Sequence, residues 1–200
     1  MKVTRARAAE HRLALLQQGG RMFRRHGIER VTIAEIARAA GLTHGAFYGH
    51  FPSKTELAAE TVAASLAAGA AGWRRRAARA RDQGADPLGA IIAGYLDPRH
   101  RDSPEDGCAL AALGSEVSRA EPPLAAALHQ GSAALAAALA DEIAALHPTL
   151  DPAVRDRRAL ATLAAMTGGI VLARALAADP AASQAVLDAA AALARAAADA

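Results

Sequence analysis

Residues 31–51, VTIAEIARAAGLTHGAFYGHF, contain the start and stop signals of two short helices. Thr32 and Glu35 have the spacing of a capping box, in which each side chain bonds a free backbone N–H of the first helical turn. Gly41 supplies the positive φ that a tight turn requires. Thr43 is a good N-cap for a second helix. The segment therefore predicts two helices, over residues 33–40 and 44–51, joined by a glycine turn.

The second of these helices has one apolar side and one polar side. Phe47 and Phe51 are four residues apart and predict the buried side. The opposite side is small or hydrogen-bonding, and it carries His44, Gly45, Tyr48 and His50. Two short helices around a glycine turn form a helix-turn-helix, whose second helix can enter the major groove of DNA. An ordinary helical hairpin without a ligand has the same generic pattern and remains an alternative.

The order of residues in this region resembles a known family. The pattern T-x-x-x-I-A-x-x-A-G-L-T-x-G-A-F-Y-x-H-F-x-S-K-x-x-L, from Thr32 to Leu57, closely resembles the DNA-binding domain of TetR/AcrR-family bacterial regulators. The resemblance covers about residues 8–60. Beyond it, only Gly107-Cys108-Ala109-Leu110 with Glu116-Val117 is similar to one branch of the family. The resemblance implies an all-helical homodimer, a palindromic double-stranded DNA operator and release from it by a small-molecule effector.

The resemblance also implies roles for individual residues. Contacts to base edges are expected from Thr43, His44 and Gly45. Contacts to phosphates are expected from Thr32, Tyr48, His50 and Lys54.

The charge of the chain is concentrated at its N-terminus. Residues 1–54 carry ten basic side chains, including Lys2, and three acidic ones. The remainder carries thirteen basic and seventeen acidic side chains. A basic module joined to a mildly acidic one suits a protein that meets a polyanion with one end. Arginine-rich helices that are merely solvated would give the same count.

Alanine and leucine dominate the rest of the chain, and both favour helix. The three pairs Asp86-Pro87, Asp151-Pro152 and Asp179-Pro180 combine an N-cap with proline at the first helical position. We expect an all-α fold with about nine helices and a polar loop over residues 97–106. The expected helices cover residues 4–26, 33–40, 44–51, 54–81, 87–96, 107–119, 123–147, 151–178 and 179–200. Residues 1–53 form the predicted DNA-binding domain, and residues 54–200 the predicted ligand-binding and dimerisation domain.

Four residues of the second domain are predicted to line its ligand pocket: Trp73, Tyr95, Cys108 and Met166. Cys108 has two interpretations. A thiol in the first turn of a helix can become a reactive thiolate, which predicts a redox or electrophile sensor. Glu105 and Asp106 oppose the anion, which favours a residue of the pocket wall. As the sequence has a single cysteine, an intrachain disulfide is excluded.

The last two expected helices are rich in small residues that allow close helix packing, and we expect them to form the dimer interface as a four-helix bundle. Leu163, Ile170, Val186 and Leu193 are its predicted apolar contacts.

Several function classes find no support in the sequence. The seven histidines lack metal-ligand spacing, and no catalytic set or phosphate loop is visible, so we expect no metal, no cofactor and no enzyme activity. A helical enzyme with an incidental hairpin and a ligand-free architectural or activating DNA-binding protein remain rival hypotheses. The longest apolar run, residues 159–173, is shorter than the about 20 residues of a membrane span. We therefore expect a cytoplasmic protein without a membrane segment.

Overall fold

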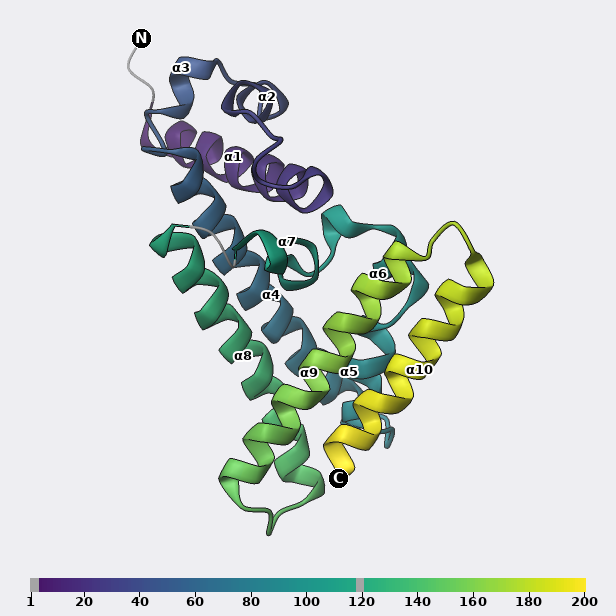
Figure 1. Cartoon of the computed structure of the whole chain (residues 1–200). Coiled ribbons are helices and arrows are strands. Elements are labelled where there is room, and N and C mark those ends of the chain that lie inside the picture. Colours follow the sequence, from purple (N-terminus) through teal and green to yellow (C-terminus); the bar gives the residue numbers. More distant parts are fainter. Residues whose placement is uncertain (1–3, 118–120) are drawn as a thin grey trace.

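Helices form every regular element of residues 4–117 and 121–200, the part of the chain that the computed structural model describes (Figure 1). All nine expected helices are present, which confirms the all-α fold class. The expected helix over 107–119 is described as far as Val117, and residues 118 and 119 lie outside the described part. The elements in order are α1 (Arg5–His26), α2 (Ile33–Ala39), α3 (His44–Phe47), α4 (Lys54–Asp82), α5 (Pro87–Tyr95), α6 (Pro98–Asp102), the 3-10 turn η1 (Pro104–Asp106), α7 (Ala109–Val117), α8 (Pro122–Leu146), α9 (Pro152–Ala175) and α10 (Pro180–Asp199).

The first three helices form an N-terminal unit on the start of α4 (Figure 1). Gly19 allows α1 to approach α4 closely, because a Cβ at this position would lie 2.9 Å from Leu57 Cδ2. The core of the unit is made by large apolar side chains from all four helices. Those that are fully or almost fully buried are Leu15, Phe23, Ile36, Phe47, Phe51 and Leu57.

Helix α3 is shorter than the sequence predicted. It ends at Phe47, and the expected continuation to Phe51 is a turn in which the His50 N–H donates to the Phe47 carbonyl at 2.9 Å. Gly49 lowers the helix propensity of this stretch, and Pro52 follows directly after it. The turn still buries Phe51, so the aromatic core is kept.

The remainder of the chain is organised around α4, which lies alongside α8, while α9 and α10 form an antiparallel pair (Figure 1). Leu66 of α4 fills the space that a side chain at Gly131 of α8 would occupy. Helices α8 and α9 are each long and apolar enough to cross a membrane, with a mean hydropathy of 1.2. Core helices of helical proteins pass the same test, and here α8 packs on α4 and α9 on α8 and α10.

The prediction of a polar loop over residues 97–106 is wrong in one respect, because this segment contains the short helix α6 and the turn η1. Asp97 caps α6 by accepting from the Arg99 N–H at 2.8 Å, and Pro98 follows at the first helical position. This Asp-Pro pair is the same start signal that the sequence uses at three other helices.

His100 joins α6 to the segment that leads into α7. Its Nδ1 lies 2.6 Å from the Tyr95 carbonyl oxygen, and its Nε2 accepts from the Cys108 N–H at 3.1 Å. The carbonyl can only accept, so Nδ1 carries the proton and the ring is neutral. Burial is the main cause that lowers the pKa of His100, and the nearby cations Arg174 and Arg76 lower it further, against the opposing effects of the Tyr95 carbonyl and Asp97.

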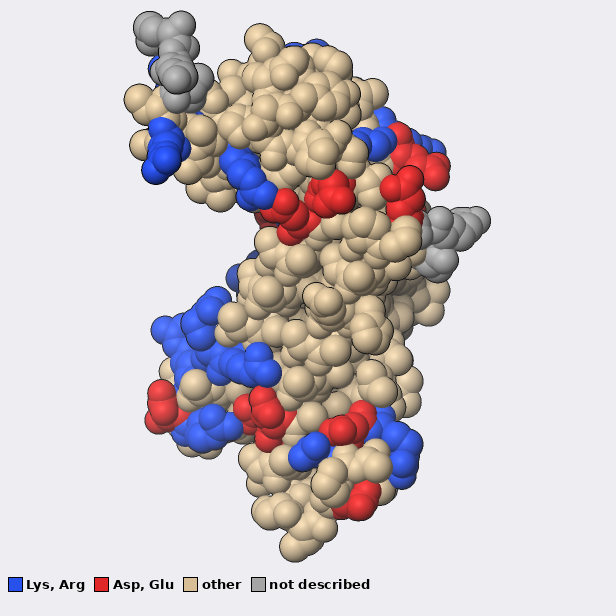
Figure 2. Space-filling model, turned by 90° about the vertical axis from the view of Figure 1, so that its left-hand side faces the viewer, with Lys and Arg blue, Asp and Glu red and all other residues tan. Residues whose placement is uncertain are grey.

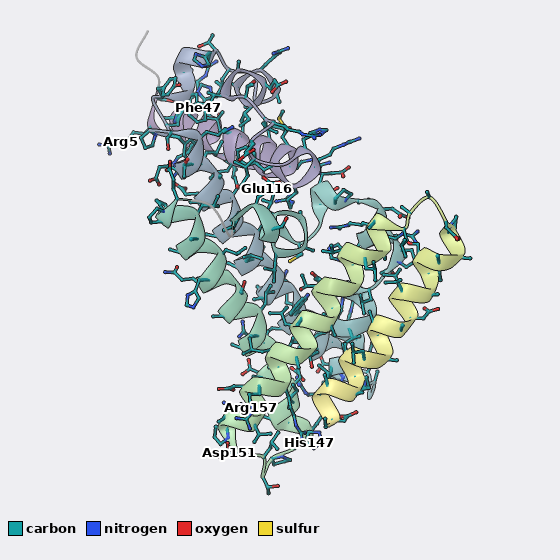
Figure 3. All side chains as sticks on the ribbon, viewed as in Figure 1. Arg5, Phe47, Glu116, His147, Asp151 and Arg157 are labelled. Atoms are coloured by element: carbon teal, nitrogen blue, oxygen red, sulfur yellow. The ribbon has the colours of Figure 1, made fainter. Side chains whose placement is uncertain are left out.

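The end of α1 is attached to η1 and α7. Glu116 lies between α7 and α1 (Figure 3), and its Oε2 accepts from the Ile28 N–H at 2.8 Å. Gly27 ends α1 with φ 84°, and a Cβ there would collide with the Glu116 carboxylate. Three arginines of α1 also reach η1. Arg24 donates to the Glu105 carbonyl, Arg21 pairs with Asp106, and Arg25 lies 3.6 Å from Glu105.

Replacing Gly27 with alanine should destabilise the protein more than replacing Gly84. Both glycines have positive φ, but a Cβ at Gly84 meets nothing within 4 Å. Gly84→Ala should cost about 1 kcal/mol of backbone strain, and Gly27→Ala about 2 kcal/mol or more, because Glu116 is displaced as well. Denaturant unfolding of both variants measures the difference. Equal losses would show that the Glu116 contact adds nothing.

His100 should make the protein more sensitive to acid. Since its pKa in the folded chain lies below the ordinary 6.5, the unfolded chain binds the proton more tightly. The stability that the neutral ring provides is therefore present above about pH 6.5 and lost as the pH falls through the lower folded pKa. His100→Gln should be less stable than the parent chain at about pH 7.5, and the gap should narrow towards about pH 5. Thermal melts at both pH values test this, with the exposed His129→Gln as the matched control; parallel melting curves for the parent and His100→Gln would contradict it.

Candidate functional site

The start of α2 is fixed by the predicted capping box. The Glu35 N–H donates to Thr32 Oγ1 at 3.2 Å, and the Thr32 N–H donates to the Glu35 carboxylate at 2.8 Å. The bonds from the backbone and hydroxyl of Thr32 lower the pKa of Glu35, because they stabilise the carboxylate. Thr32 is exposed, so its side chain both holds the cap and lies at the surface.

The turn into α3 also follows the sequence prediction. Gly41 has φ 73°, and Thr43 Oγ1 accepts from the Ala46 N–H at 3.3 Å. Phe47 lies inside the N-terminal unit (Figure 3) and is fully buried. Of the face predicted to enter the major groove, His44, Gly45 and Tyr48 are exposed and His50 is half-buried; Thr43, the third predicted base contact, is exposed as well.

Two details of α3 bear on what it can contact. The rings of His44 and Tyr48 meet edge to face with centroids 5.5 Å apart, so the two side chains support each other at the surface. A Cβ at Gly45 would meet nothing within 4 Å. Packing within the chain therefore does not require glycine at this position, and its backbone is open to approach from outside.

Two of the predicted phosphate-binding residues are engaged within the protein. His50 is half-buried with its ring 5.9 Å from that of His11, and burial is the main cause that lowers its pKa. Lys54 Nζ donates to the carbonyls of Ile28, Glu29 and Val31 at 2.9, 3.3 and 3.0 Å. An ammonium has three N–H donors, so these bonds satisfy Lys54 completely. Lys54 thus fastens the α1–α2 turn to the start of α4, and a phosphate contact would require it to give up those bonds.

A cleft of about 720 Å³ lies between α1, the helices α4, α5 and α6, and the segment 103–108, with Leu135 of α8 also in its wall. Figure 2 shows the molecule hollowed below its N-terminal helices, with Lys and Arg side chains gathered beneath the hollow. Helix α1 contributes Leu13, Leu16, Gln17, Gly20 and Arg24 to its wall. Because α1 also carries the helix-turn-helix, a molecule in the cleft would touch both parts of the chain.

Three of the four predicted pocket residues line this cleft: Trp73, Tyr95 and Cys108. The Trp73 and Tyr95 rings meet edge to face at 5.5 Å, and burial is the main cause that raises the pKa of Tyr95. The prediction for Met166 is not met. Met166 is completely buried on α9 and does not line the cleft, because α9 packs against α8 and α10.

Two charged residues of the cleft, Arg76 and Arg24, were not predicted from the sequence, and neither was the contact that Glu116 makes. Arg76 lines the cleft three residues after Trp73, a spacing that places both on one helical face. Arg24 lines it from α1, and Glu116 connects α7 to the turn after α1. Glu116 is the one charged residue of the apolar helix α7, and this was the available signal.

Within the described residues, no group of three or more His, Cys, Asp and Glu side chains could hold a metal ion.

Comparison with known proteins places the N-terminal unit in a family. Residues 15–61 match the sequence profile described as "Bacterial regulatory proteins, tetR family". The HTH-type transcriptional regulator TtgR of Pseudomonas putida is 43% identical over 54 residues, which are 27% of this chain and 26% of TtgR. The chain therefore matches about a quarter of the length of this relative.

Solved structures resemble the chain over almost its whole length. The TetR-family transcriptional regulator from Cytophaga hutchinsonii has a TM-score of 0.74 at 17% identity, with 98% of each chain covered. The TetR-family repressor FadR of Thermus thermophilus, in complex with lauroyl-CoA, has a TM-score of 0.61 at 19% identity and covers 92% of this chain and 93% of its own. At these identities the likeness concerns the fold. Residues 15–61 thus carry the sequence signature of bacterial regulatory proteins of the tetR family, and the chain as a whole has the fold of solved regulators of that family.

Proposed function

We propose that the chain is a cytoplasmic transcriptional repressor that binds a palindromic operator as a homodimer and is released by a small molecule. The observation that carries this proposal is the exposed start of α3, presented by a capped helix-turn-helix on a strongly basic unit. In this proposal residues 1–53 bind DNA, and residues 54–200 bind the effector and the second protomer. A regulator of this kind needs no catalytic residues.

On DNA, Thr43, His44 and Gly45 would meet base edges, with the open backbone at Gly45 allowing close approach. Thr32, Tyr48 and His50 would lie near phosphates. Exposed arginines add to the attraction for the polyanion, among them Arg5 at the outer edge of α1 (Figure 3).

The dimer interface is proposed on the outer faces of α9 and α10. The exposed large apolar residues there are Leu160, Val171, Leu172, Leu176 and Leu193, with exposed fractions of 37–60%. The predicted contacts Leu163 and Ile170 are 5% and 0% exposed, so they belong to the core of a single protomer instead. Val186 is half-buried, and Leu193 at 60% remains a good candidate.

Effector and DNA would be coupled through residues 103–108. On one side this segment holds α1 through the Glu105 carbonyl and the Asp106 carboxylate. On the other side Ser103, Asp106, Gly107 and Cys108 line the cleft. A ligand that prefers a different position of this segment would change the angle of α1, and with it the spacing of the two recognition helices. Operator binding requires that spacing to be about 34–36 Å or a multiple of it.

The thiol-sensor alternative at Cys108 is not supported. The chain offers no second cysteine to resolve an oxidised thiol, and Cys108 is a half-buried residue of the cleft wall. By contrast, the likeness to a repressor crystallised with lauroyl-CoA supports a small-molecule effector.

Replacing Thr43 or His44 with alanine should relax base preference at definite operator positions, by about 1–3 kcal/mol for a good contact. Thr43→Ala should also cost about 1 kcal/mol of stability, because it removes a helix cap. Selection from randomised DNA sites measures the preference of each variant. Thr4→Ala is the matched control, since Thr4 caps α1 by accepting from the Arg7 N–H. If both α3 variants select the same sites as the parent chain, α3 does not read the operator.

Charged substitutions should separate the dimer interface from the protomer core. Leu160→Arg and Leu193→Arg should give folded monomers, because both leucines are exposed in a single chain. Leu163→Arg should unfold the protein, because a buried unpaired charge costs several kcal/mol. Light scattering and circular dichroism report assembly and folding. Folded dimers from both surface variants would place the interface elsewhere.

A further inference from the structure

The cleft has an apolar interior between α1 and α4. On α4 its wall consists of the small residues Thr61, Ala64, Ser65, Ala68, Gly69 and Gly72. On α1 the opposite wall has an apolar part, where Leu13 lines the cleft with 55% of its surface exposed and Leu16 lies beside the same space. From Thr61 to Arg76 the wall of α4 is about 22 Å long at 1.5 Å per residue. The space is therefore long enough for an extended apolar body.

The charges around this space are mostly cationic once existing pairs are counted. Asp106 pairs with Arg21, while Arg99 of the cleft wall pairs with Asp97 at 3.0 Å. Arg24 donates to the Glu105 carbonyl, which carries no charge. Arg76 lies near Asp97, but that carboxylate is already bound by Arg99. Arg24 also faces Asp106 and donates twice to the Glu105 carbonyl, whereas no described carboxylate pairs with Arg76, so the cleft offers chiefly the guanidinium of Arg76 to an anion.

The guanidinium of Arg76 lies against the backbone of α5 at Gly94. A Cβ at Gly94 would collide with the guanidinium of Arg76, so the side chain lies directly against this glycine. Arg75 and Arg79 line a smaller hollow that shares Arg76 with the cleft, so the positive potential continues beyond its mouth. A guanidinium at the end of an apolar groove is suited to a carboxylate or a similar anionic head group.

The geometry points to an amphipathic organic anion as the effector, with its apolar body between Leu13 of α1 and the small residues of α4 and its anionic group at Arg76. This inference rests on the proposed function for its regulatory meaning, but the binding site stands on the cleft alone. Such a ligand contacts the DNA-binding unit directly through α1. Its apolar body would therefore act on α1 directly, in addition to the connection through residues 103–108.

Three probes with the same ten-carbon chain test the charge preference: decanoate, decanol and decyltrimethylammonium, each below the concentration at which it forms micelles. Calorimetric titration of the full-length dimer without DNA should rank decanoate first, about tenfold tighter than decanol, with the cation weakest. Decanol binding as tightly as decanoate, or the cation binding best, would overturn the inference.

Variants then locate the two ends of the ligand. Arg76→Gln should remove about tenfold of the preference for decanoate over decanol. Gly94→Ala keeps the charge but displaces the guanidinium, and should lower the preference in the same direction. Arg74→Gln is the matched control, because Arg74 is on the same helix but pairs with Asp141 outside the cleft. If Arg74→Gln and Arg76→Gln lose the same preference for decanoate over decanol, the anion is attracted by the surface arginines in general, and the site at Arg76 is overturned.

The apolar end has its own matched pair. Ala68→Leu fills the cleft and should weaken decanoate and decanol alike, whereas Ala67→Leu changes the neighbouring exposed residue, which does not line the cleft. Unchanged binding of both probes to Ala68→Leu would overturn the placement.

A separate measurement adds the operator selected from randomised DNA and asks whether decanoate releases it. Release supports both the inference and the proposed function. Anion binding in a chain that selects no DNA site would overturn the function and leave the cleft assignment standing. Operator binding by a chain that shows no preference for decanoate over decanol would overturn the cleft assignment and leave the proposed function standing.

Discussion

The bond from the Ile28 N–H to Glu116 fixes how the DNA-binding helices are carried by the rest of the molecule. It lies where α1 ends, at a glycine whose positive φ and missing Cβ leave room for the carboxylate. The arginines of α1 that reach Glu105 and Asp106 hold the same end of the helix against η1. With α1 fixed at this end and packed against α4 at Gly19, the position of α3 follows from the internal packing of the N-terminal unit.

The same short segment also bounds the cleft. His100 of α6 holds the residues between α6 and α7, because one of its ring nitrogens donates to the Tyr95 carbonyl and the other accepts from the Cys108 N–H. Arg174 of α9 donates to the carbonyls of His100 and Arg101 and so links the segment to the helices proposed for dimerisation. One connector therefore contacts the α1 unit, the cleft and α9, and a change at any of them reaches the others through a few bonds.

The helix-turn-helix could be predicted because residues close in sequence act on one another there. The capping box at Thr32, the glycine turn at Gly41 and the cap at Thr43 all involve neighbours within three residues, so the helix-turn-helix could be predicted without a structure. Helix α6 was missed although Asp97-Pro98 carries the same start signal as three predicted helices, because the polar composition around it was taken to indicate a loop. The early end of α3 reflects Gly49 and Pro52, whose effect was underestimated.

The sequence by itself determined the all-helical fold, the DNA-binding motif, the buried aromatic pair and the cleft residues Trp73, Tyr95 and Cys108. Only the tertiary structure decided which polar groups are already occupied. Lys54 is bound by three carbonyls some 25 positions earlier in the chain, and Leu163 and Ile170 point into their own protomer and not towards a partner. It also decided that Arg24 and Arg76, far apart in sequence, face one cleft. The physical reason is that helical periodicity fixes which residues share a face, whereas the neighbour that covers this face is set by long-range packing.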